Sequence, residues 1–196
     1  LAKIGCGRGH GSGVEYTAAA RYGRPRRARG GARPSPAKMA AFATPAAMRI
    51  ITLNVNGIRS AARKGVARWL ARVEPWDVVC LQEIKCAHDD VPPPMRAPRK
   101  STATFHPAVR KGYSGVAIYS KVPHVAATGF GHPEFDAEGR YVEAHFRDVT
   151  VVSVYLPSGS AGPHRQASKF RFLEAFLPHL AALRARGREV VLCGDW

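Results

Sequence analysis

The sequence is poor in acidic residues and in cysteine, and it has no long apolar run. Its 196 residues include 14 Asp and Glu against 30 Lys and Arg, a formal net charge of +16. No apolar run approaches the roughly 20 residues of a membrane-spanning helix, so no membrane partner is expected. The four cysteines contain no Cys-x-x-Cys pair, which disfavours a zinc site. They suggest no disulfide framework either, which favours a reducing, cytoplasmic setting.

The positive charge is concentrated near the N-terminus. Residues 1–47 hold nine Lys and Arg and a single acid, Glu15, so this quarter of the chain carries half of the net charge. The remainder still has 21 basic against 13 acidic residues. A basic globular part favours a polyanionic partner such as nucleic acid. Charge alone does not separate this interpretation from a basic domain without such a partner.

Residues 1–47 are predicted to be a disordered basic tail. They are rich in Gly, Ala, Arg and Pro and show no periodicity, so they cannot bury enough surface to offset their ordering entropy. The alternatives are a nucleic-acid-binding arm and a transit peptide, and the low serine content disfavours the second. We favour a tail, or upstream sequence translated in error, because the chain starts with Leu1 and Met48 directly precedes the first expected strand.

From Met48 onward the pattern is typical of a single α/β domain with mixed strands and covering helices. Residues 86–101 are expected to form a loop, because three consecutive prolines disfavour regular structure. The helix over residues 164–186 is expected to bury Phe170, Leu173, Phe176, Leu177 and Leu180. The expected strands are 49–54, 77–82, 115–120, 140–146, 149–156 and 189–193, and the other expected helix is 59–73.

Four polar side chains stand at or just beyond the ends of expected strands. They are Asn54, Glu83, Tyr155 and Asp195. Ligands of open α/β sheets bind beyond the carboxyl ends of strands. Taken singly, each residue has an ordinary interpretation, such as a solvated acid, a turn residue, a helix cap or a rim aromatic.

Together these four residues suit the hydrolysis of a phosphodiester, which needs charge neutralisation at phosphorus, an activated water and a stabilised leaving oxygen. Glu83 is the best candidate ligand for Mg²⁺, which prefers oxygen and needs only one or two carboxylates. Asn54 would orient a metal-bound water or contact phosphate. Asp195 would serve as a general base, and the Tyr155 hydroxyl would donate to a phosphate oxygen.

The joint order of six motifs is more specific than any single residue. They read Asn-x-Asn-Gly-Ile-Arg, Leu-Gln-Glu-x-Lys, Gly-Tyr-Ser-Gly-Val-Ala-Ile, Gly-Arg-Tyr-Val, Tyr-x-Pro-Ser-Gly and Cys-Gly-Asp. This set resembles the exonuclease III branch of the endonuclease/exonuclease/phosphatase superfamily over residues 48–196. The resemblance implies an α/β four-layer sandwich of two packed mixed sheets flanked by helices.

The resemblance also implies an activity and partners. Members of this branch are abasic-site endonucleases and 3′→5′ exodeoxyribonucleases of base excision repair. They use Mg²⁺, with Mn²⁺ as a substitute. The expected partner is double-stranded DNA with abasic sites or 3′ ends, the expected state is a monomer, and the expected location is the cytoplasm, at the nucleoid through DNA.

Carried over by resemblance, Asn54 would organise the metal site and Glu83 would bind the metal. Tyr155 would contact the scissile phosphate. Asp195 would position or deprotonate the nucleophile, or protonate the leaving group. Weaker candidates for DNA contacts are Lys85, Lys111, Tyr113 and Arg140.

The sequence departs from the family pattern at its end. The family motif is Gly-Asp-x-Asn, and here the sequence stops at Trp196, before that Asn, the later Asp residues and a terminal Asp-His pair. We therefore expect residues 48–196 to be the N-terminal part of the domain and the fragment to be inactive. Two alternatives remain: a phosphatase for small phosphoesters on the same fold, and a non-catalytic nucleic-acid-binding protein built around residues 1–47.

Overall fold

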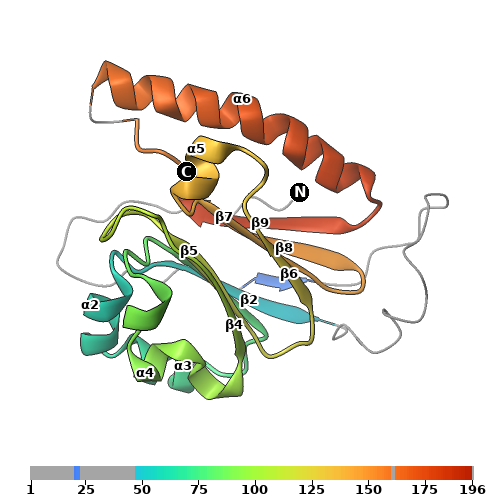
Figure 1. Ribbon diagram of the computed structural model, residues 1–196. Helices are drawn as coiled ribbons and strands as arrows, with labels where there is room; N and C mark the ends of the chain where they lie inside the picture. Colours follow the sequence, from blue (N-terminus) through green and yellow to red (C-terminus); the bar gives the residue numbers. More distant parts are fainter. Residues whose placement is uncertain (1–19, 23–46, 160–161, 196) are drawn as a thin grey trace.

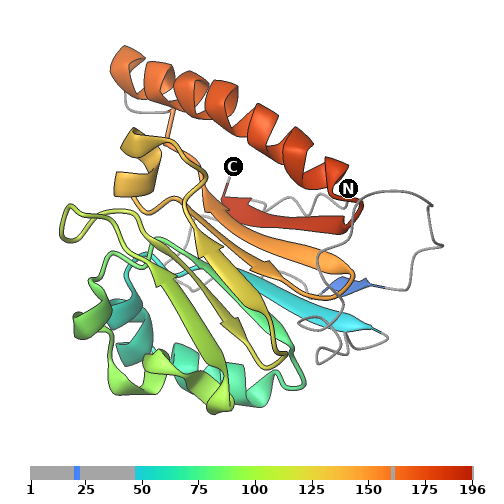
Figure 2. The ribbon, with the colours of Figure 1, turned by 45° about the vertical axis from the view of Figure 1, so that its right-hand side comes forward.

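The computed structural model describes residues 20–22, 47–159 and 162–195, which form two β-sheets packed face to face (Figure 1). Helix α6 lies over the outer face of one sheet, and α2, α3 and α4 lie against the outer face of the other (Figures 1 and 2). The result is a layered sandwich of helices, sheet, sheet and helix, and the predicted fold class is confirmed.

The first sheet has the strand order β1-β2-β3-β5-β4 and is mixed. Strands β2 and β3 are parallel, and the other neighbours are antiparallel. Its strands are β1 (Ala20–Tyr22), β2 (Met48–Asn54), β3 (Val78–Gln82), β4 (Thr102–His106) and β5 (Val116–Ser120).

The second sheet has the order β6-β7-β8-β9 and is also mixed. Strands β8 and β9 are parallel, whereas β6, β7 and β8 are antiparallel neighbours. The predicted hairpin at Arg147 and Asp148 is confirmed, since it joins β7 to β8. The strands are β6 (Val125–Thr128), β7 (Tyr141–His145), β8 (Val149–Tyr155) and β9 (Glu189–Asp195).

The described helices are α2 (Ile58–Arg63), α3 (Val66–Arg72), α4 (Pro93–Arg96), α5 (Pro133–Ala137) and α6 (Pro163–Ala185), with 3₁₀ turns at His88–Asp90 and Pro98–Lys100. None of these helices has the length and apolar character needed to span a bilayer.

Two expectations about helices are wrong. The single helix expected over residues 59–73 is two helices, because Gly65 adopts a left-handed φ of 86° and starts a second one. The expected loop at 86–101 contains α4, which begins at Pro93. Proline is tolerated in the first turn of a helix, where its missing N–H has no partner to lose.

The expected core face of the long helix is partly wrong. Phe176 is buried as predicted, and Leu173 and Leu180 are partly buried, but Phe170 and Leu177 are 54% and 59% exposed. The helix carries apolar residues on most of its circumference, so the sequence did not define one face. The side chains that α6 buries are Ser168, Phe172, Phe176 and Leu183.

Strand β3 is buried on both faces. Val79 and Leu81 belong to the core between the first sheet and its helices, and Val78 and Cys80 belong to the core between the two sheets. This explains why the strand is a continuous apolar run. A buried hydrogen bond from Gln82 Nε2 to Ser153 Oγ, 3.0 Å long, also joins the two sheets.

Most of the expected disordered tail lies outside the described residues. The exception within it is β1, where Ala20–Tyr22 pair antiparallel with β2. The outer edge of β2 offers unpaired backbone groups, and β1 hydrogen-bonds to them.

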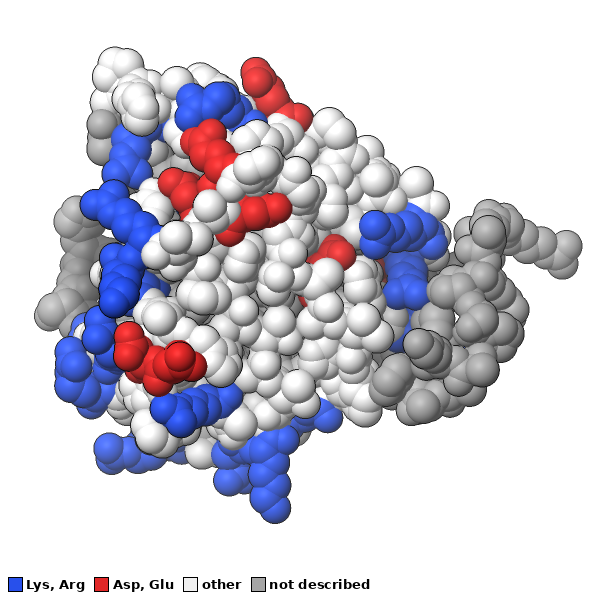
Figure 3. All heavy atoms as spheres, in the orientation of Figure 1, with Lys and Arg blue, Asp and Glu red and all other residues white. Residues whose placement is uncertain are grey.

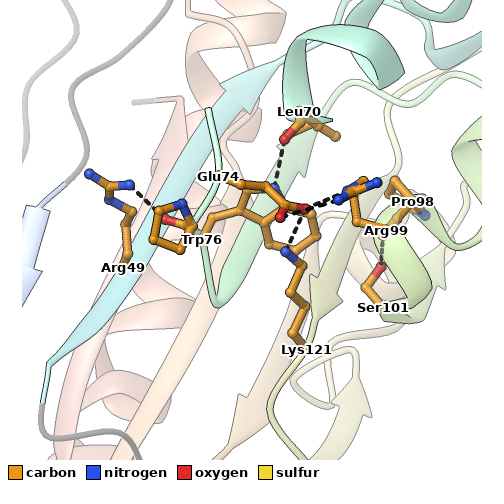
Figure 4. A network of polar contacts seen from close by, with 9 residues as sticks. Arg49, Leu70, Glu74, Trp76, Pro98, Arg99, Ser101 and Lys121 are labelled. Atoms are coloured by element: carbon orange, nitrogen blue, oxygen red, sulfur yellow. Dashed lines mark hydrogen bonds and ion pairs between the residues drawn. The ribbon is translucent and has the colours of Figure 1, made fainter. Parts of the chain in front are cut away.

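A cluster of polar side chains lies at the end of the first sheet where β3 begins (Figure 4). Glu74 forms ion pairs with Arg99, whose Nε lies at 2.6 Å, and with Lys121, whose Nζ lies at 2.8 Å. The Lys121 ammonium also lies 4.1 Å from the centre of the Trp76 ring. The hydrogen bonds from Arg99 and Lys121 lower the pKa of Glu74 to about 2.

Candidate active site

The carboxyl ends of β2, β3, β8 and β9 meet at one edge of the sandwich. Parallel pairing places Asn54 opposite Gln82 at the ends of β2 and β3, and Tyr155 opposite Asp195 at the ends of β8 and β9. Because the two sheets face each other, polar residues from both arrive at the same edge, on the left of Figure 1. The strand-end positions predicted from the sequence are therefore brought together.

Asn54 is the centre of this arrangement. Its Nδ2 donates to Glu83 Oε1 and to Asp195 Oδ2, both at 2.8 Å. Its Oδ1 accepts the backbone N–H of Asn56 at 2.9 Å, which fixes the orientation of the amide. One side chain therefore aligns two carboxylates that come from different sheets.

Glu83 is ionised and rigidly held. Burial, the largest single influence, opposes ionisation, but hydrogen bonds from Lys85, Asn54 and Tyr155 outweigh it and lower the pKa of the Glu83 carboxyl. Its carbonyl oxygen accepts the N–H of Gly57 at 2.7 Å. Its φ of 55° lies in the left-handed region, which is unusual for a residue other than glycine.

Several residues near Glu83 also have a left-handed backbone conformation. Asn56, Lys85 and Ser114 have left-handed φ values, of 41°, 48° and 40°. The three loops that carry these residues are joined by backbone hydrogen bonds, among them Lys85 N–H to Ser114 O at 2.8 Å. Such strain persists only where surrounding contacts determine the conformation, and it is concentrated at functional sites.

The Tyr155 hydroxyl interacts electrostatically with the Glu83 carboxylate. Burial first, and then the charge of Glu83, raise the pKa of the Tyr155 phenol well above its ordinary value. The hydroxyl therefore stays protonated at neutral pH and can act as a donor at this edge.

Lys85 lies inside the cluster. Its Nζ is 2.6 Å from Glu83 Oε2 and 2.6 Å from Asn56 Oδ1. In the sequence it was a weak candidate for a DNA contact. The structure shows that its ammonium is the cation paired with Glu83.

Arg140 is a buried support behind Tyr155. It is only 1% exposed, and it donates to the Tyr155 carbonyl oxygen at 3.0 Å and to the Tyr113 hydroxyl at 2.9 Å. It also forms an ion pair with Glu138. Its guanidinium centre lies 5.1 Å from the Tyr155 ring, at cation–π distance. Its direct contact with DNA stays a prediction.

A polar cavity of about 290 Å³ adjoins Tyr113. Arg165 donates to the Tyr113 hydroxyl at 3.2 Å, and the Arg110 guanidinium lies 5.4 Å from the Tyr113 ring. Arg110 and Arg165 come from different segments and carry no motif, so no sequence pattern pointed to them. Lys111 is exposed on the turn beside Arg110. The lining residues are Arg110, Tyr113, Glu134, Ala137, Glu138, His164, Arg165 and Ser168.

Basic side chains gather along the same edge of the molecule. Figure 3 shows Lys and Arg in a band on the left, from the beginning of α6 down to the side on which α2 lies. A concentration of Lys and Arg on one side of a protein favours the approach of a polyanion.

The donor set suits a hard divalent cation. Glu83 and Asp195 offer carboxylate oxygens, and Asn54 and Asn56 offer amide oxygens, the ligand type that Mg²⁺ prefers. Within residues 20–22, 47–159 and 162–195, no group of three or more His, Cys, Asp or Glu could hold a metal ion. The carboxylates of Glu83 and Asp195 could hold a cation together with water.

Comparison with known proteins agrees with this architecture. Residues 51–196 match the model of the endonuclease/exonuclease/phosphatase family. An exodeoxyribonuclease of Bacillus subtilis is 36% identical over 149 residues, which is 76% of this chain and 58% of that protein. The zebrafish DNA repair nuclease APEX1 is 36% identical over 153 residues, which cover 76% of this chain and 48% of that protein.

Solved structures of similar proteins share the fold. The 3′-5′ exonuclease NExo of Neisseria meningitidis aligns with a TM-score of 0.66 at 28% identity, over 76% of this chain and 57% of that one. The catalytic domain of Xenopus laevis APE2 aligns with a TM-score of 0.62 at 28% identity, over 76% of this chain and 58% of that one. The chain thus spans about half to three fifths of the length of these relatives.

Proposed function

Because the chain belongs to the endonuclease/exonuclease/phosphatase family, we propose that it is the site-bearing part of a Mg²⁺-dependent DNA phosphodiesterase. The whole protein would cut duplex DNA at abasic sites and remove nucleotides from 3′ ends during base excision repair. The observation that carries this proposal is the single amide of Asn54 that aligns Glu83 and Asp195, with the Tyr155 hydroxyl beside them. The activity is proposed for the whole protein, because the chain spans only 58% of its Bacillus relative.

Each residue of the cluster has a distinct task in this mechanism. Glu83 would hold the Mg²⁺ and Asn54 would organise the site by keeping the Glu83 carboxylate in place; the cation, when bound, would neutralise charge on the phosphate. Asn54 orients Asp195 through Oδ2, and Asp195 takes the proton of the attacking water. Tyr155 donates its hydroxyl to a phosphate oxygen, and Arg140 holds the Tyr155 backbone in place.

The basic edge supports DNA as the substrate. Duplex DNA carries one charge for each 1.7 Å or so of its axis, so a band of Lys and Arg beside the carboxylates would bind several phosphates. Lys111 and Tyr113 are the proposed contacts; Lys111 follows Arg110 in the chain, and Tyr113 lines the cavity together with Arg110 and Arg165. The similarity to an exodeoxyribonuclease and to a DNA repair nuclease also supports a DNA substrate.

A competition assay separates this proposal from a phosphatase on the same fold. The whole protein is given a labelled duplex with one abasic site, together with a hundredfold excess of a small phosphomonoester. We expect strand incision at an unchanged rate and no release of inorganic phosphate. Release of phosphate with little incision would instead identify a phosphatase for small substrates.

A further inference from the structure

The ammonium of Lys85 pairs with the one Glu83 carboxylate oxygen that the Asn54 amide does not contact. Lys85 Nζ lies 2.6 Å from Glu83 Oε2. The other carboxylate oxygen, Oε1, accepts the Asn54 amide, so both oxygens of Glu83 already have a donor. The Glu83 side chain is only 14% exposed, which leaves little room for a further ligand unless one donor moves.

Lys85 is the donor that can move. Its backbone is fixed by the hydrogen bond from its N–H to Ser114 O, but its side chain is 33% exposed. The Asn54 amide is held at three points, by Glu83, Asp195 and the Asn56 N–H. An ammonium and a divalent ion on one carboxylate would also repel each other strongly at this separation, since Mg²⁺ binds oxygen at about 2.1 Å.

We propose that Lys85 is a tethered competitor for the divalent cation at Glu83. In the free protein its ammonium neutralises the carboxylate, and cation binding requires the ammonium to leave Oε2. Asn56 Oδ1 also holds the ammonium at 2.6 Å, so the displaced group stays at the site and becomes available to a phosphate oxygen. This inference rests on the metal site of the proposed function and assigns to Lys85 the control of its occupancy.

The proposal predicts that removing the Lys85 charge tightens cation binding. Mn²⁺ is titrated into the 196-residue chain by isothermal calorimetry at pH 7.5 and low salt, without DNA. We expect Lys85→Met to lower the Kd for Mn²⁺ by about tenfold, the scale of one close charge pair at partial exposure. Lys85→Gln should also lower the Kd for Mn²⁺, which would show that the effect does not depend on the methionine side chain.

Two control variants make the result specific. Lys100→Met removes one exposed lysine charge from the 3₁₀ turn at Pro98–Lys100, at the opposite end of the first sheet from Glu83, so its Kd should stay within about twofold of wild type. Glu83→Gln removes the carboxylate, so Mn²⁺ binding should disappear. Circular dichroism melts of all variants confirm that each one is folded.

The outcomes separate the claim that Lys85 competes with the cation from the claim that Glu83 binds it. Tighter binding in both Lys85 variants, with loss of binding in Glu83→Gln, supports the competitor. Equal or weaker binding in the Lys85 variants, with loss of binding in Glu83→Gln, would contradict competition by Lys85 and would still support cation binding by Glu83. No Mn²⁺ binding in wild type or in the Lys85 variants would overturn both.

Discussion

Asn54 Nδ2 donates to Asp195 Oδ2 at 2.8 Å across 141 positions of the chain. The same nitrogen donates to Glu83 Oε1, so one amide links the end of the first sheet to the end of the second. The geometry of the site therefore depends on how the two sheets pack, as well as on the loops that carry the acids.

The first prediction concerns the ionisation of Glu83 in Asn54→Ala. The Asn54 amide is one of the donors that lower the pKa of Glu83, so its loss should raise that pKa. A depressed carboxyl pKa stabilises the fold above the ordinary value near 4.5, and this stabilisation is lost as the pH falls through the folded-state pKa. The gap in unfolding free energy between wild type and variant should therefore be larger at pH 7 than at pH 3. Carbon-detected NMR titration in metal-free buffer measures the pKa directly, and an unchanged Glu83 pKa would contradict the role of Asn54.

The second prediction separates catalysis from packing at Tyr155. Tyr155→Phe removes only the hydroxyl, which interacts with Glu83 and, in the mechanism, donates to phosphate. We expect single-turnover incision by the whole protein to fall by about 10²-fold, with a change in stability of about 1 kcal/mol or less. Tyr119→Phe is the matched control, because the Tyr119 hydroxyl donates to Met95 O away from the site. It should lower the melting temperature and leave the rate unchanged, and equal rate losses in both variants would contradict the assignment.

The third prediction concerns the acid stability of the Glu74 cluster. The pKa of Glu74 is lowered to about 2 by hydrogen bonds from Arg99 and Lys121. The stabilisation is fully present above the ordinary value of 4.5 and disappears as the pH falls toward 2. Glu74→Gln should thus have a lower melting temperature than wild type at pH 7, and the difference should shrink between pH 4.5 and the lowest pH at which both fold. A difference that stays constant with pH would show that charge is not the cause.

The fourth prediction concerns the close approach of β8 and β9 beside Asp195. A Cβ on Gly194 would lie 2.5 Å from the Val154 carbonyl oxygen, within the strand ladder. Gly194→Ala should therefore destabilise the fold by about 1–3 kcal/mol, and it should shift Asp195 away from Asn54. Gly159→Ala is the control, because its Cβ would meet the end of the flexible Gln166 side chain, at 2.4 Å, and that side chain can move. Equal melting temperatures for the two variants would contradict this account of Gly194.

The sequence was sufficient to predict the fold class and the four strand-end residues. Strand ends are defined by short apolar runs, and parallel strands bring their carboxyl ends to one edge, so Asn54 and Glu83 meet in the first sheet and Tyr155 and Asp195 in the second. The packing of the two sheets then brings Asn54 to Asp195. The sequence did not reveal that Lys85 pairs with Glu83. Two residues on one loop can point apart or together, and the left-handed backbone at both positions decides that they meet.

Other features depend on packing that no local pattern encodes. The cavity beside Tyr113 is assembled from the β4–β5 turn, α5 and the start of α6, so Arg110 and Arg165 became neighbours only through tertiary structure. Phe170 and Leu177 were expected in the core because the spacing of apolar residues along α6 allowed more than one face. The burial of Arg140 could not be predicted from the sequence either, because its partners Glu138, Tyr113 and Tyr155 come from three segments.

The most direct test of the central claim is incision of a duplex with one abasic site by the whole protein and by its Glu83→Ala variant. Both are measured with Mg²⁺ and with EDTA, at enzyme excess. The account predicts Mg²⁺-dependent incision by wild type, none in EDTA, and loss of incision in a Glu83→Ala variant that a melting curve shows to be folded. Incision by Glu83→Ala at the wild-type rate would contradict the claim that this carboxylate holds the catalytic cation.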